Sequence, residues 1–490
     1  MSSLESIIHE RLKKLAYLRD EGINPFPESA EFSHTIAESE RAFDTLAKEN
    51  NMVTLGGRVT TFRNQGAIIF FNFTDGTGVF QGMLRQDEVG KSAVLFFEST
   101  VDIGDFIELD GMLTKTKRGE KTILVTSWRM LAKSLRPLPE KWHGLKDTEE
   151  RFRKRYLDIL MNEEVRERFL TRAKILASLR RFLEDDGFIE VETPVLQHLA
   201  GGATAKPFQT HYNALDSDMF LRIAPELYLK ELLVGGFPKV FEMGRNFRNE
   251  GIDVTHNPEF TMLEFYEAYS DAKRQQEKVE SLVRAMVEAV YGGTHFTYDG
   301  QDINAEEPFR RASLYDLLKE HTDIIDPTAL GRAEYVEYAE KHRISTAPSD
   351  SREKIIDTIY KKIVKPKLFQ PTFIIDYPTA FSPFAKRQEE NPDLIARFQL
   401  VIGGLEIVNA FSELNDPEEQ RRRYGAEEKK RAKGEMDVSP ADEAYIEAME
   451  YGMPPAGGVG LGVDRLVMLL TDAQNIREVI LFPTLKQKNE

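Results

Sequence analysis

A change of pattern near residue 163 constrains the fold more than any other feature. Between residues 53 and 135, apolar or β-branched runs of strand length are separated by turn signals such as Asp75-Gly76-Thr77-Gly78. These runs are Val53–Thr61, Ala67–Asp75, Val79–Leu84, Phe106–Thr114 and Lys121–Leu131. About five strands in about 80 residues predict a small barrel, with a small β-sandwich as the alternative. From residue 163 onward, a long amphipathic helix (about 163–186) and then mixed strands and helices predict a larger α+β domain.

The ends and the connector complete the predicted domain order. Residues 4–20 carry apolar side chains at three- and four-residue steps, which predicts a helix that packs on a neighbour or, alternatively, touches RNA. Residues 136–162 are rich in charge and proline and are typical of a connector, most of which we assign to a linker over 139–162. We therefore expect a helical extension over 1–50, a barrel domain over 51–138, a linker over 139–162 and an α+β domain over 163–490.

Composition narrows the chemistry. The chain of 490 residues has 41% hydrophobic and 30% charged residues, the balance of a globular protein. It contains no cysteine, which excludes a disulfide framework, a thiol nucleophile and a cysteine-ligated zinc site. No apolar run is long enough for a signal peptide or a membrane span, so we expect a cytoplasmic protein without membrane contact. The formal net charge of −16 argues weakly against nucleic-acid binding, although a local basic stripe remains compatible with it.

The segment from Phe241 to Glu250 predicts an arginine at a strand end. Arg248 and Glu250 share one face if the strand reaches them, and Glu264 and Tyr266 share a face of the next strand. The planar guanidinium of an arginine suits a carboxylate or a phosphate. The alternative is a surface ion pair, which stabilises a protein by about 0–1 kcal/mol.

The segment from Gln399 to Asp416 predicts a hairpin that carries polar residues. Gly403-Gly404 lies between two apolar runs and is typical of a two-residue turn, which pairs Val401 with Glu406. Strict alternation places Glu406 and Glu413 on opposite faces, so a bulge or twist must intervene if both line one pocket. An edge strand with one solvated face is the alternative.

Glycines mark two further segments. Gly457–Leu470 has a Gly-x-Gly pattern but lacks the βαβ context of a dinucleotide-binding loop, so we interpret it as a glycine strand followed by a helix, with Arg465 at the junction. Gly201-Gly202 predicts a loop, and Pro225 places Glu226 in the first turn of a helix. Tight packing and a capping Asp464 are the alternatives for the first segment, and a carboxylate that stabilises the helix dipole is the alternative for Glu226.

Taken together and in order, these segments resemble the class II aminoacyl-tRNA synthetases over nearly the whole chain. The long helix together with GFIEVETP (187–194) is similar to motif 1 of that class. FRNE (247–250), followed by His256, Glu259 and Phe260, is similar to motif 2, and GLGVDRLVM (460–468) is similar to motif 3. Segments such as GGATAKPF, RIAPELYLK, HNPEFTMLE and NAFSELNDP resemble the lysine enzymes of bacterial type. The resemblance implies an OB-fold barrel that reads the anticodon, followed by an antiparallel sheet flanked by helices.

The resemblance also implies roles for individual residues. It implies catalysis by Arg248 and Arg465, and ATP binding by Arg248, Glu250, His256, Phe260, Glu406 and Arg465. Lysine would be held by Gly202, Glu226, Arg248, Glu264, Tyr266, Asn409, Phe411 and Glu413. In the barrel, Phe70, Gln81 and Arg63 would contact the anticodon. The alternative for Phe70 is a core aromatic residue, a role that Phe71 or Phe73 beside it could fill instead. The implied partners are ATP, L-lysine, tRNA(Lys) and a second copy of the chain that docks through motif 1.

Magnesium is the implied cofactor, with Glu406 as one ligand. Gln399 stands where the lysine enzymes commonly have a metal-binding glutamate. An amide oxygen can still bind magnesium but carries no negative charge, so the resemblance leaves the number of bound ions open.

Three other functions compete with this interpretation. A paralogue that lysylates a protein lacks the N-terminal barrel, which residues 53–135 argue against. The carboxylates Glu226, Glu264 and Glu413 argue for a cationic substrate over aspartate or asparagine. A non-catalytic relative usually lacks the motif 2 or motif 3 arginine, and both Arg248 and Arg465 are present.

Overall fold

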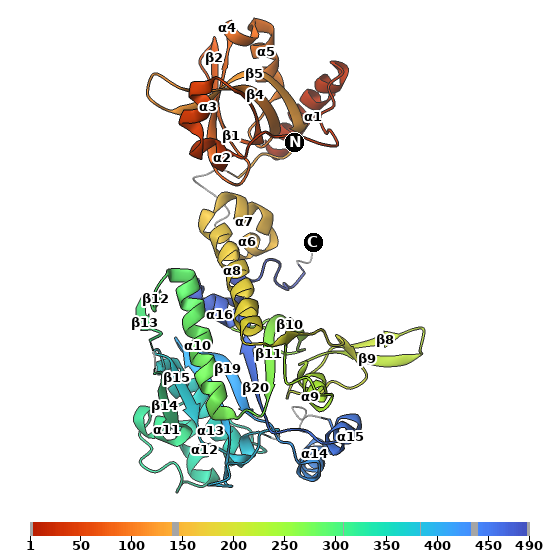
Figure 1. Ribbon diagram of the computed structural model, residues 1–490, viewed down its shortest axis with the longest axis vertical. Coiled ribbons are helices and arrows are strands. Elements are labelled where there is room, and N and C mark those ends of the chain that lie inside the picture. Colours follow the sequence, from red (N-terminus) through yellow and green to blue (C-terminus); the bar gives the residue numbers. More distant parts are fainter. Residues whose placement is uncertain (1–2, 140–146, 307, 383, 433–439, 488–490) are drawn as a thin grey trace. The chain divides into compact units, whose positions relative to one another are not determined.

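The chain forms two compact units, which are described separately. The computed structural model describes residues 3–139, 147–306, 308–382, 384–432 and 440–487. The first unit comprises Met1–Leu145 and the second Lys146–Glu490 (Figure 1). No helix within these described ranges is long and apolar enough to cross a membrane.

The first unit is a closed five-stranded barrel with strand order β1-β2-β3-β5-β4. Its strands are β1 (Met52–Asn64), β2 (Ile68–Thr74), β3 (Val79–Arg85), β4 (Phe106–Lys115) and β5 (Lys121–Ala132). All five predicted strands are confirmed, and closure of the barrel excludes the sandwich alternative. Alternation explains the core, because Ile69, Phe71 and Phe73 of β2 point inward and are fully buried.

Helices surround this barrel: α1 (Ser3–Asp20), α2 (Ile36–Arg41), α3 (Phe43–Glu49), α4 (Gln86–Val89) and α5 (Lys91–Thr100). The predicted first helix is confirmed as α1. It packs on the barrel because Arg11 donates hydrogen bonds to the carbonyl oxygens of Ile103, Ser134 and Arg136, at 2.9–3.1 Å. The sequence interpretation missed α4 and α5. The N-cap residue of α5 is Gly90, which has no side chain to cap the helix.

A buried lysine connects two loops of this unit. The ammonium of Lys133 lies 2.5 Å from Asp102 and 2.7 Å from Asp105, and it also donates to the carbonyl oxygen of Thr100. Lys14 on α1 forms an ion pair with the same Asp102 at 2.8 Å but is partly exposed. The two lysines therefore share one partner and differ in burial.

We predict that Lys133→Met lowers the free energy of unfolding of the first unit by about 3–5 kcal/mol, because it leaves a buried carboxylate without its cation. Lys14→Met removes a partly exposed pair and should cost about 1 kcal/mol or less. Urea denaturation followed by hydrogen–deuterium exchange of barrel peptides measures the loss of unfolding free energy in each variant. Equal losses in the two variants would contradict the distinction.

An eight-stranded sheet forms the centre of the second unit, with strand order β14-β15-β18-β19-β20-β11-β10-β6. Its strands are β6 (Ile189–Glu190), β10 (Lys239–Phe247), β11 (Glu259–Ala268), β14 (Arg310–Ser313), β15 (Thr372–Ile375), β18 (Arg397–Ile402), β19 (Leu405–Ser412) and β20 (Ala456–Gly462). The expected antiparallel sheet is found, except that the outermost pairs, β14 with β15 and β10 with β6, are parallel.

Smaller sheets extend from this centre. A three-stranded sheet contains β7 (Leu196–Gln197), β8 (Gln209–Tyr212) and β9 (Ser217–Leu221) and projects from the unit in Figure 1. Two-stranded sheets pair β12 (His295–Tyr298) with β13 (Gln301–Asn304), and β16 (Tyr377–Pro378) with β17 (Leu394–Ile395).

Helices cover both faces of the central sheet. Two cores result: Leu263 and Phe265 of β11 face one that includes α8, α10 and α16, whereas Tyr266 faces another that includes α9, α11, α13 and α15. The helices are α8 (Glu163–Asp185), α9 (Glu226–Val234), α10 (Ala272–Tyr291), α11 (Leu314–His321), α12 (Arg332–Lys341), α13 (Arg352–Ile359), α14 (Pro417–Ala432), α15 (Glu443–Glu450), α16 (Val463–Leu470) and α17 (Ile476–Val479). Short 3-10 or π turns occupy Tyr360–Val364, Lys365–Lys367 and Thr379–Phe381.

Part of the segment that we predicted as a linker forms helices. Residues 140–146 lie outside the described residues, but α6 (Thr148–Arg153) and α7 (Arg155–Met161) follow directly. Arg155 is buried and donates to the carbonyl oxygens of Arg477, Ile480 and Leu481. Residues 148–161 therefore pack on the second unit, a long-range contact that charge and proline content do not reveal.

Candidate active site

The central strands place the expected pocket residues on one face of the sheet. Register aligns Glu264 with Gly460 and Asn409 in one row, and Tyr266 with Gly458 and Phe411 in the next. The opposite face carries the apolar residues that alternate with them, such as Leu263, Val459 and Ala410. The sheet therefore brings the motif 2 and motif 3 strands and the hairpin strand together at one polar surface.

The glycine strand β20 makes room for this surface. A Cβ atom on Gly458 would lie 1.9 Å from Oε1 of Glu413 and 2.5 Å from Cε1 of Tyr266. Such approaches are far below van der Waals contact, so any side chain at Gly458 would displace both groups. The predicted glycine strand is therefore present, and the space beside Gly458 is occupied by Glu413 and Tyr266.

A β-bulge resolves the alternation problem in the hairpin. Val401 pairs with Glu406, as predicted from the Gly403-Gly404 turn, but Leu400 pairs with Val408. Ile407 is therefore an extra residue, which shifts the alternation by one position. Because of this shift, Glu406 faces the same side as Asn409 and Glu413.

Three acidic side chains, Glu226, Glu264 and Glu413, are buried in the pocket, with 7%, 3% and 1% of their surface exposed. The hydroxyl of Tyr266 donates to Glu264 at 3.0 Å. Burial is the largest influence on Glu264 and Glu413, and it raises the pKa of each carboxyl to about 8. Oε1 of Glu413 has no hydrogen-bond partner among the described residues, which leaves this oxygen available to a ligand.

Gly202 approaches the same pocket from the loop before β8. Its φ of +83° is a left-handed conformation that favours glycine, and a Cβ atom there would lie 2.9 Å from the Cβ of Glu226. The helix α9 begins at Glu226 with Pro225 as its N-cap, as predicted. Gly202 therefore lies beside the first residue of this helix.

Arg248 lies just beyond the end of β10. Its guanidinium carbon is 5.0 Å from the ring centre of Phe260 on β11, and its buried Nε has no hydrogen-bond partner among the described residues. Burial lowers the pKa of Arg248, although Glu250 and Glu264 oppose that effect. An unpartnered, buried guanidinium donor is suited to a carboxylate or phosphate ligand.

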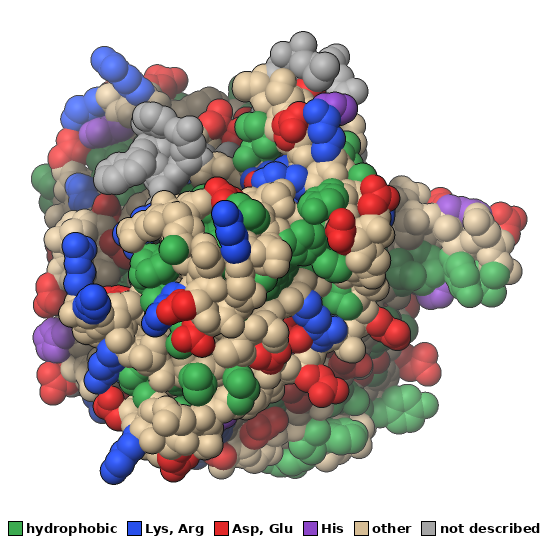
Figure 2. Space-filling view, turned by 90° about the horizontal axis from the view of Figure 1, so that it is seen from above, with side chains coloured by type: hydrophobic (Ala, Val, Ile, Leu, Met, Phe, Trp, Pro, Cys, Tyr) green, Lys and Arg blue, Asp and Glu red, His purple; other side chains and the backbone are tan. Residues whose placement is uncertain are grey.

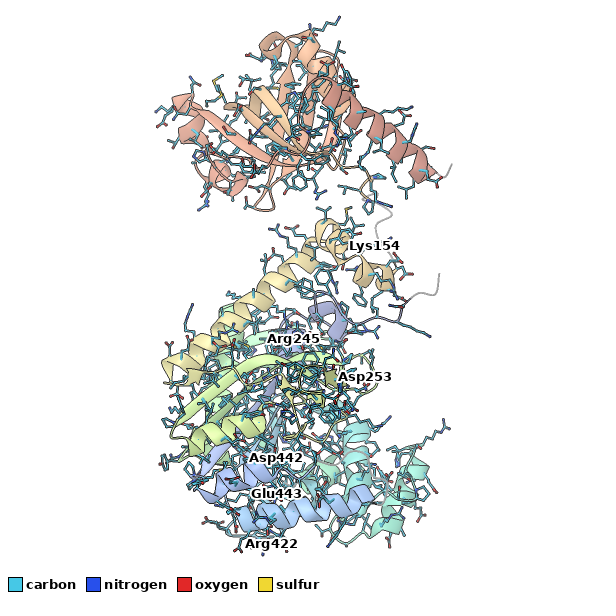
Figure 3. All side chains as sticks on the ribbon, turned by 90° about the vertical axis from the view of Figure 1, so that its right-hand side faces the viewer. Lys154, Arg245, Asp253, Arg422, Asp442 and Glu443 are labelled. Atoms are coloured by element: carbon cyan, nitrogen blue, oxygen red, sulfur yellow. The ribbon has the colours of Figure 1, made fainter. Side chains whose placement is uncertain are left out.

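A second cationic group lies at the start of α16. Nη2 of Arg465 is 3.0 Å from Nε2 of His256, and Nη1 donates to the carbonyl oxygen of Glu406 at 3.1 Å. The other ring nitrogen of His256 lies 2.8 Å from Asp253, which is labelled in Figure 3 in the loop between β10 and β11. Asp464 is not the helix cap; it accepts hydrogen bonds from Arg172 and from the backbone of Thr261.

The expected metal ligands differ in availability. Burial raises the pKa of Glu406, but Arg465, Lys365 and other nearby cations outweigh it and lower the pKa below its usual value, so this carboxylate is charged. The Gln399 amide oxygen already accepts a hydrogen bond from the hydroxyl of Tyr377 at 2.7 Å. Among the residues that the structure describes, no group of three or more acidic or histidine side chains is arranged to hold a metal ion. Glu406 fits a magnesium ligand, whereas Gln399 has another partner.

In the first unit, the residues expected to read the anticodon share one side of the barrel wall. Arg63 pairs with Phe70 across β1 and β2, and Gln81 on β3 pairs with Asn72, whose side chain points to the same side as Phe70. Phe70 is half-buried and faces outward, whereas Phe71 and Phe73 occupy the core. Gln81 accepts a hydrogen bond from Thr122 at 2.8 Å.

Comparison with known proteins identifies the family. Residues 147–486 match the model of the class II tRNA synthetases (D, K and N), and residues 53–131 match the OB-fold nucleic acid binding domain. The lysine–tRNA ligase of Pelotomaculum thermopropionicum is 48% identical, covering 99% of this chain and 96% of that protein. Those of Carboxydothermus hydrogenoformans and Chloroflexus aurantiacus are 47% and 45% identical, each covering 99% of both chains. The chain belongs to the lysine–tRNA ligase family of class II tRNA synthetases.

One important pocket residue of this family member was missed in the sequence. Lys230 is buried, and its ammonium lies 2.5 Å from both Glu226 and Glu413. Its position four residues after Glu226 on a predicted helix is a signal for an ion pair that could have found it. Tyr445, whose ring centre lies 6.0 Å from the same ammonium, comes from a distant helix and has no local signal.

We predict that Gly458→Ala lowers the free energy of unfolding by about 1–3 kcal/mol, because the methyl group overlaps Glu413 and Tyr266. Gly460→Ala is the matched comparison: its methyl group meets only the flexible end of Met262 at 3.3 Å and the Asn409 carbonyl oxygen at 3.5 Å. We expect a smaller loss there. Urea denaturation of the second unit and a crystal structure of each variant are the measurements; an undisplaced Glu413 carboxylate in Gly458→Ala would contradict the overlap.

Proposed function

We propose that this chain joins L-lysine to the 3′ end of tRNA(Lys) with ATP. In the first step, an oxygen of the lysine carboxylate attacks the α-phosphorus of ATP, and the bond to the β-phosphate oxygen breaks, which releases pyrophosphate. In the second step, the terminal hydroxyl of the tRNA attacks the carbonyl carbon of the lysyl-adenylate, loses its proton, and AMP leaves. Neither step requires a covalent bond to the protein.

The buried carboxylates carry this proposal. Glu226, Glu264 and Glu413 are buried close enough together to influence one another's charge, and Arg248 lies close enough to lower the pKa of Glu264. A molecule with two ammonium groups and one carboxylate complements that arrangement. An uncharged analogue leaves the acidic groups unpaired, which costs roughly 3–5 kcal/mol and corresponds to about 10²–10⁴-fold rejection. Asn409 and Phe411 complete the walls of the proposed lysine pocket, together with Gly202 and Tyr266.

The cationic groups support the proposed ATP site. Arg248 would bridge the lysine carboxylate and the α-phosphate, and Phe260 would stack under the adenine ring. Arg465 and His256 would bind the remaining phosphates, and Glu250 would contact ATP from its exposed position after β10. Positioning and charge neutralisation by these side chains would account for the catalysis.

Magnesium would be held by Glu406 and by the phosphates of ATP, and when bound it would neutralise phosphate charge. Gln399 is a weaker candidate because Tyr377 uses its amide oxygen. A magnesium ion that depends on one protein carboxylate draws most of its ligands from the substrate and from water.

The barrel supports tRNA as the second substrate. Phe70 would stack on an anticodon base, Gln81 would hydrogen-bond to it and Arg63 would contact the backbone or the base. On the face drawn in Figure 2, acidic and basic side chains are interspersed. The proposed contact relies on the local groups Phe70, Gln81 and Arg63.

We further propose a homodimer that docks through motif 1. That segment and the two residues directly after it expose apolar side chains: Ile189, Val195 and Leu196 are each 40–47% exposed. Exposed apolar residues that cluster in one segment are typical of a protein interface. We expect the reaction to take place in the cytoplasm, in agreement with the absence of cysteine.

Amino-acid-dependent exchange of pyrophosphate into ATP, measured with each of the twenty amino acids, tests the proposed function. Lysine should be the best substrate, and norleucine, which has a similar length and lacks the ε-ammonium, should be at least about 10²-fold less efficient in kcat/KM. Fastest exchange with another amino acid would overturn the assignment.

Phe70→Ala tests the anticodon contact separately. Loss of stacking on an unpaired base should weaken tRNA binding by about 1–3 kcal/mol, so kcat/KM for tRNA falls while pyrophosphate exchange stays unchanged. Leu95→Ala, at an exposed apolar residue on α5, is the control and should leave both reactions intact. An equal kcat/KM for tRNA in the wild-type protein and in Phe70→Ala would contradict the proposed contact between Phe70 and the anticodon.

A further inference from the structure

A buried lysine of the chain itself lies within the acidic pocket. Lys230 on α9 has 1% of its surface exposed. Its ammonium is 2.5 Å from Oε1 of Glu226, one turn earlier on the same helix, and 2.5 Å from Oε2 of Glu413, just beyond β19. A single buried cation therefore links carboxylates from two separate elements.

Aromatic rings enclose this ammonium. The ring centres of Tyr266, Phe384, Phe411 and Tyr445 lie 5.3–6.0 Å from Nζ of Lys230. Tyr445 belongs to α15, whose first turn is held by Asp442, labelled in Figure 3 with its neighbour Glu443. This enclosure excludes water and strengthens every electrostatic interaction inside it.

The charges of the pocket add up to a simple balance. Glu226, Glu264 and Glu413 carry three negative charges when ionised, and Lys230 cancels one of them. The remaining two match the two ammonium groups of free lysine, while the substrate carboxylate is left to Arg248. Without Lys230, the empty pocket would hold three mutually repelling carboxylates in a place where burial disfavours each of them.

We propose that Lys230 is a positioning residue for lysine recognition: its ammonium holds the Glu226 and Glu413 side chains in the arrangement that receives the substrate. The proposal deepens the proposed function and rests on it. It assigns a role in specificity to a residue that does not itself touch the reacting atoms.

The neighbouring charges define the expected pH dependence. The groups that face Glu413 are Glu226 and Lys230 from α9, Glu264 and Tyr266 from β11, and Tyr445 from α15. Burial raises the pKa of Glu413 and Glu264, and Lys230 lowers both. Removal of the Lys230 charge therefore raises these two pKa values further, so at pH 7 the carboxyls hold their protons more tightly and bind an ammonium less well.

The test compares KM for lysine in pyrophosphate exchange at pH 7 and pH 9. Lys230→Met should raise KM at pH 7 by about tenfold or more, because each unit of pKa corresponds to about tenfold in binding. The ratio of variant to wild-type KM should narrow at pH 9, where a larger fraction of the carboxyls is ionised in both proteins. The ratio cancels the titration of free lysine itself, and kcat should change little.

Further variants separate charge from shape. Lys230→Arg keeps the charge and should restore KM at pH 7 toward the wild-type value. Lys230→Gln is neutral but can still donate hydrogen bonds; it should show the same pH-dependent rise as Lys230→Met and serves in its place if that variant does not fold. Lys133→Met is the matched control, since Lys133 is also buried between two carboxylates but lies in the barrel, so its KM for lysine should equal that of the wild type.

The outcomes are distinguishable. An unchanged KM in the neutral variants, or an equal rise at pH 7 and pH 9, overturns the role of Lys230. Absence of lysine-dependent exchange in the wild-type protein overturns the proposed function, whatever the variants do.

Discussion

The pocket depends on a constraint on buried negative charge. Three glutamates approach one another where little water reaches them, and isolated carboxylates in such a place lose their charge or require a partner. Lys230 supplies one partner, the Tyr266 hydroxyl donates a hydrogen bond to Glu264, and protons are held at pKa values near 8. A ligand with two ammonium groups supplies what is still missing. The unbalanced negative charge of the three glutamates is sufficient to select such a ligand, so selectivity requires no further domain.

The sheet provides the precision that this arrangement needs. Adjacent strands bring Glu264, Gly460 and Asn409 into one row, so three segments separated by up to about 200 residues share a surface through backbone register alone. Gly458 leaves space that Glu413 and Tyr266 occupy, and the bulge at Ile407 turns Glu406 to the same side. Arg248 lies just beyond the end of a strand and Arg465 lies near the start of a helix, so regular backbone structure positions both side chains.

Local patterns predicted much of this architecture, and long-range contacts account for what they missed. The five barrel strands and the Gly403-Gly404 hairpin were predictable because alternation and turn residues are local signals. The sequence showed that Glu406 and Glu413 can share a face only if a bulge or twist lies between them, but nothing in the hairpin sequence indicates the position of that bulge. The linker interpretation failed at Arg155, whose partners lie more than 300 residues away. Likewise, the Tyr377 hydroxyl that occupies the Gln399 amide oxygen is apparent only in three dimensions.

Lysine binding followed by titration calorimetry at pH 7, in buffers of different ionisation enthalpy, tests the charge balance most directly. The carboxyls of Glu264 and Glu413, with pKa values of about 8, hold protons at pH 7 in the free protein. A bound ammonium favours their ionised forms, so binding should release protons to the buffer, and the measured enthalpy should change with the buffer accordingly. An enthalpy that is the same in every buffer, or one that indicates proton uptake, would contradict the account.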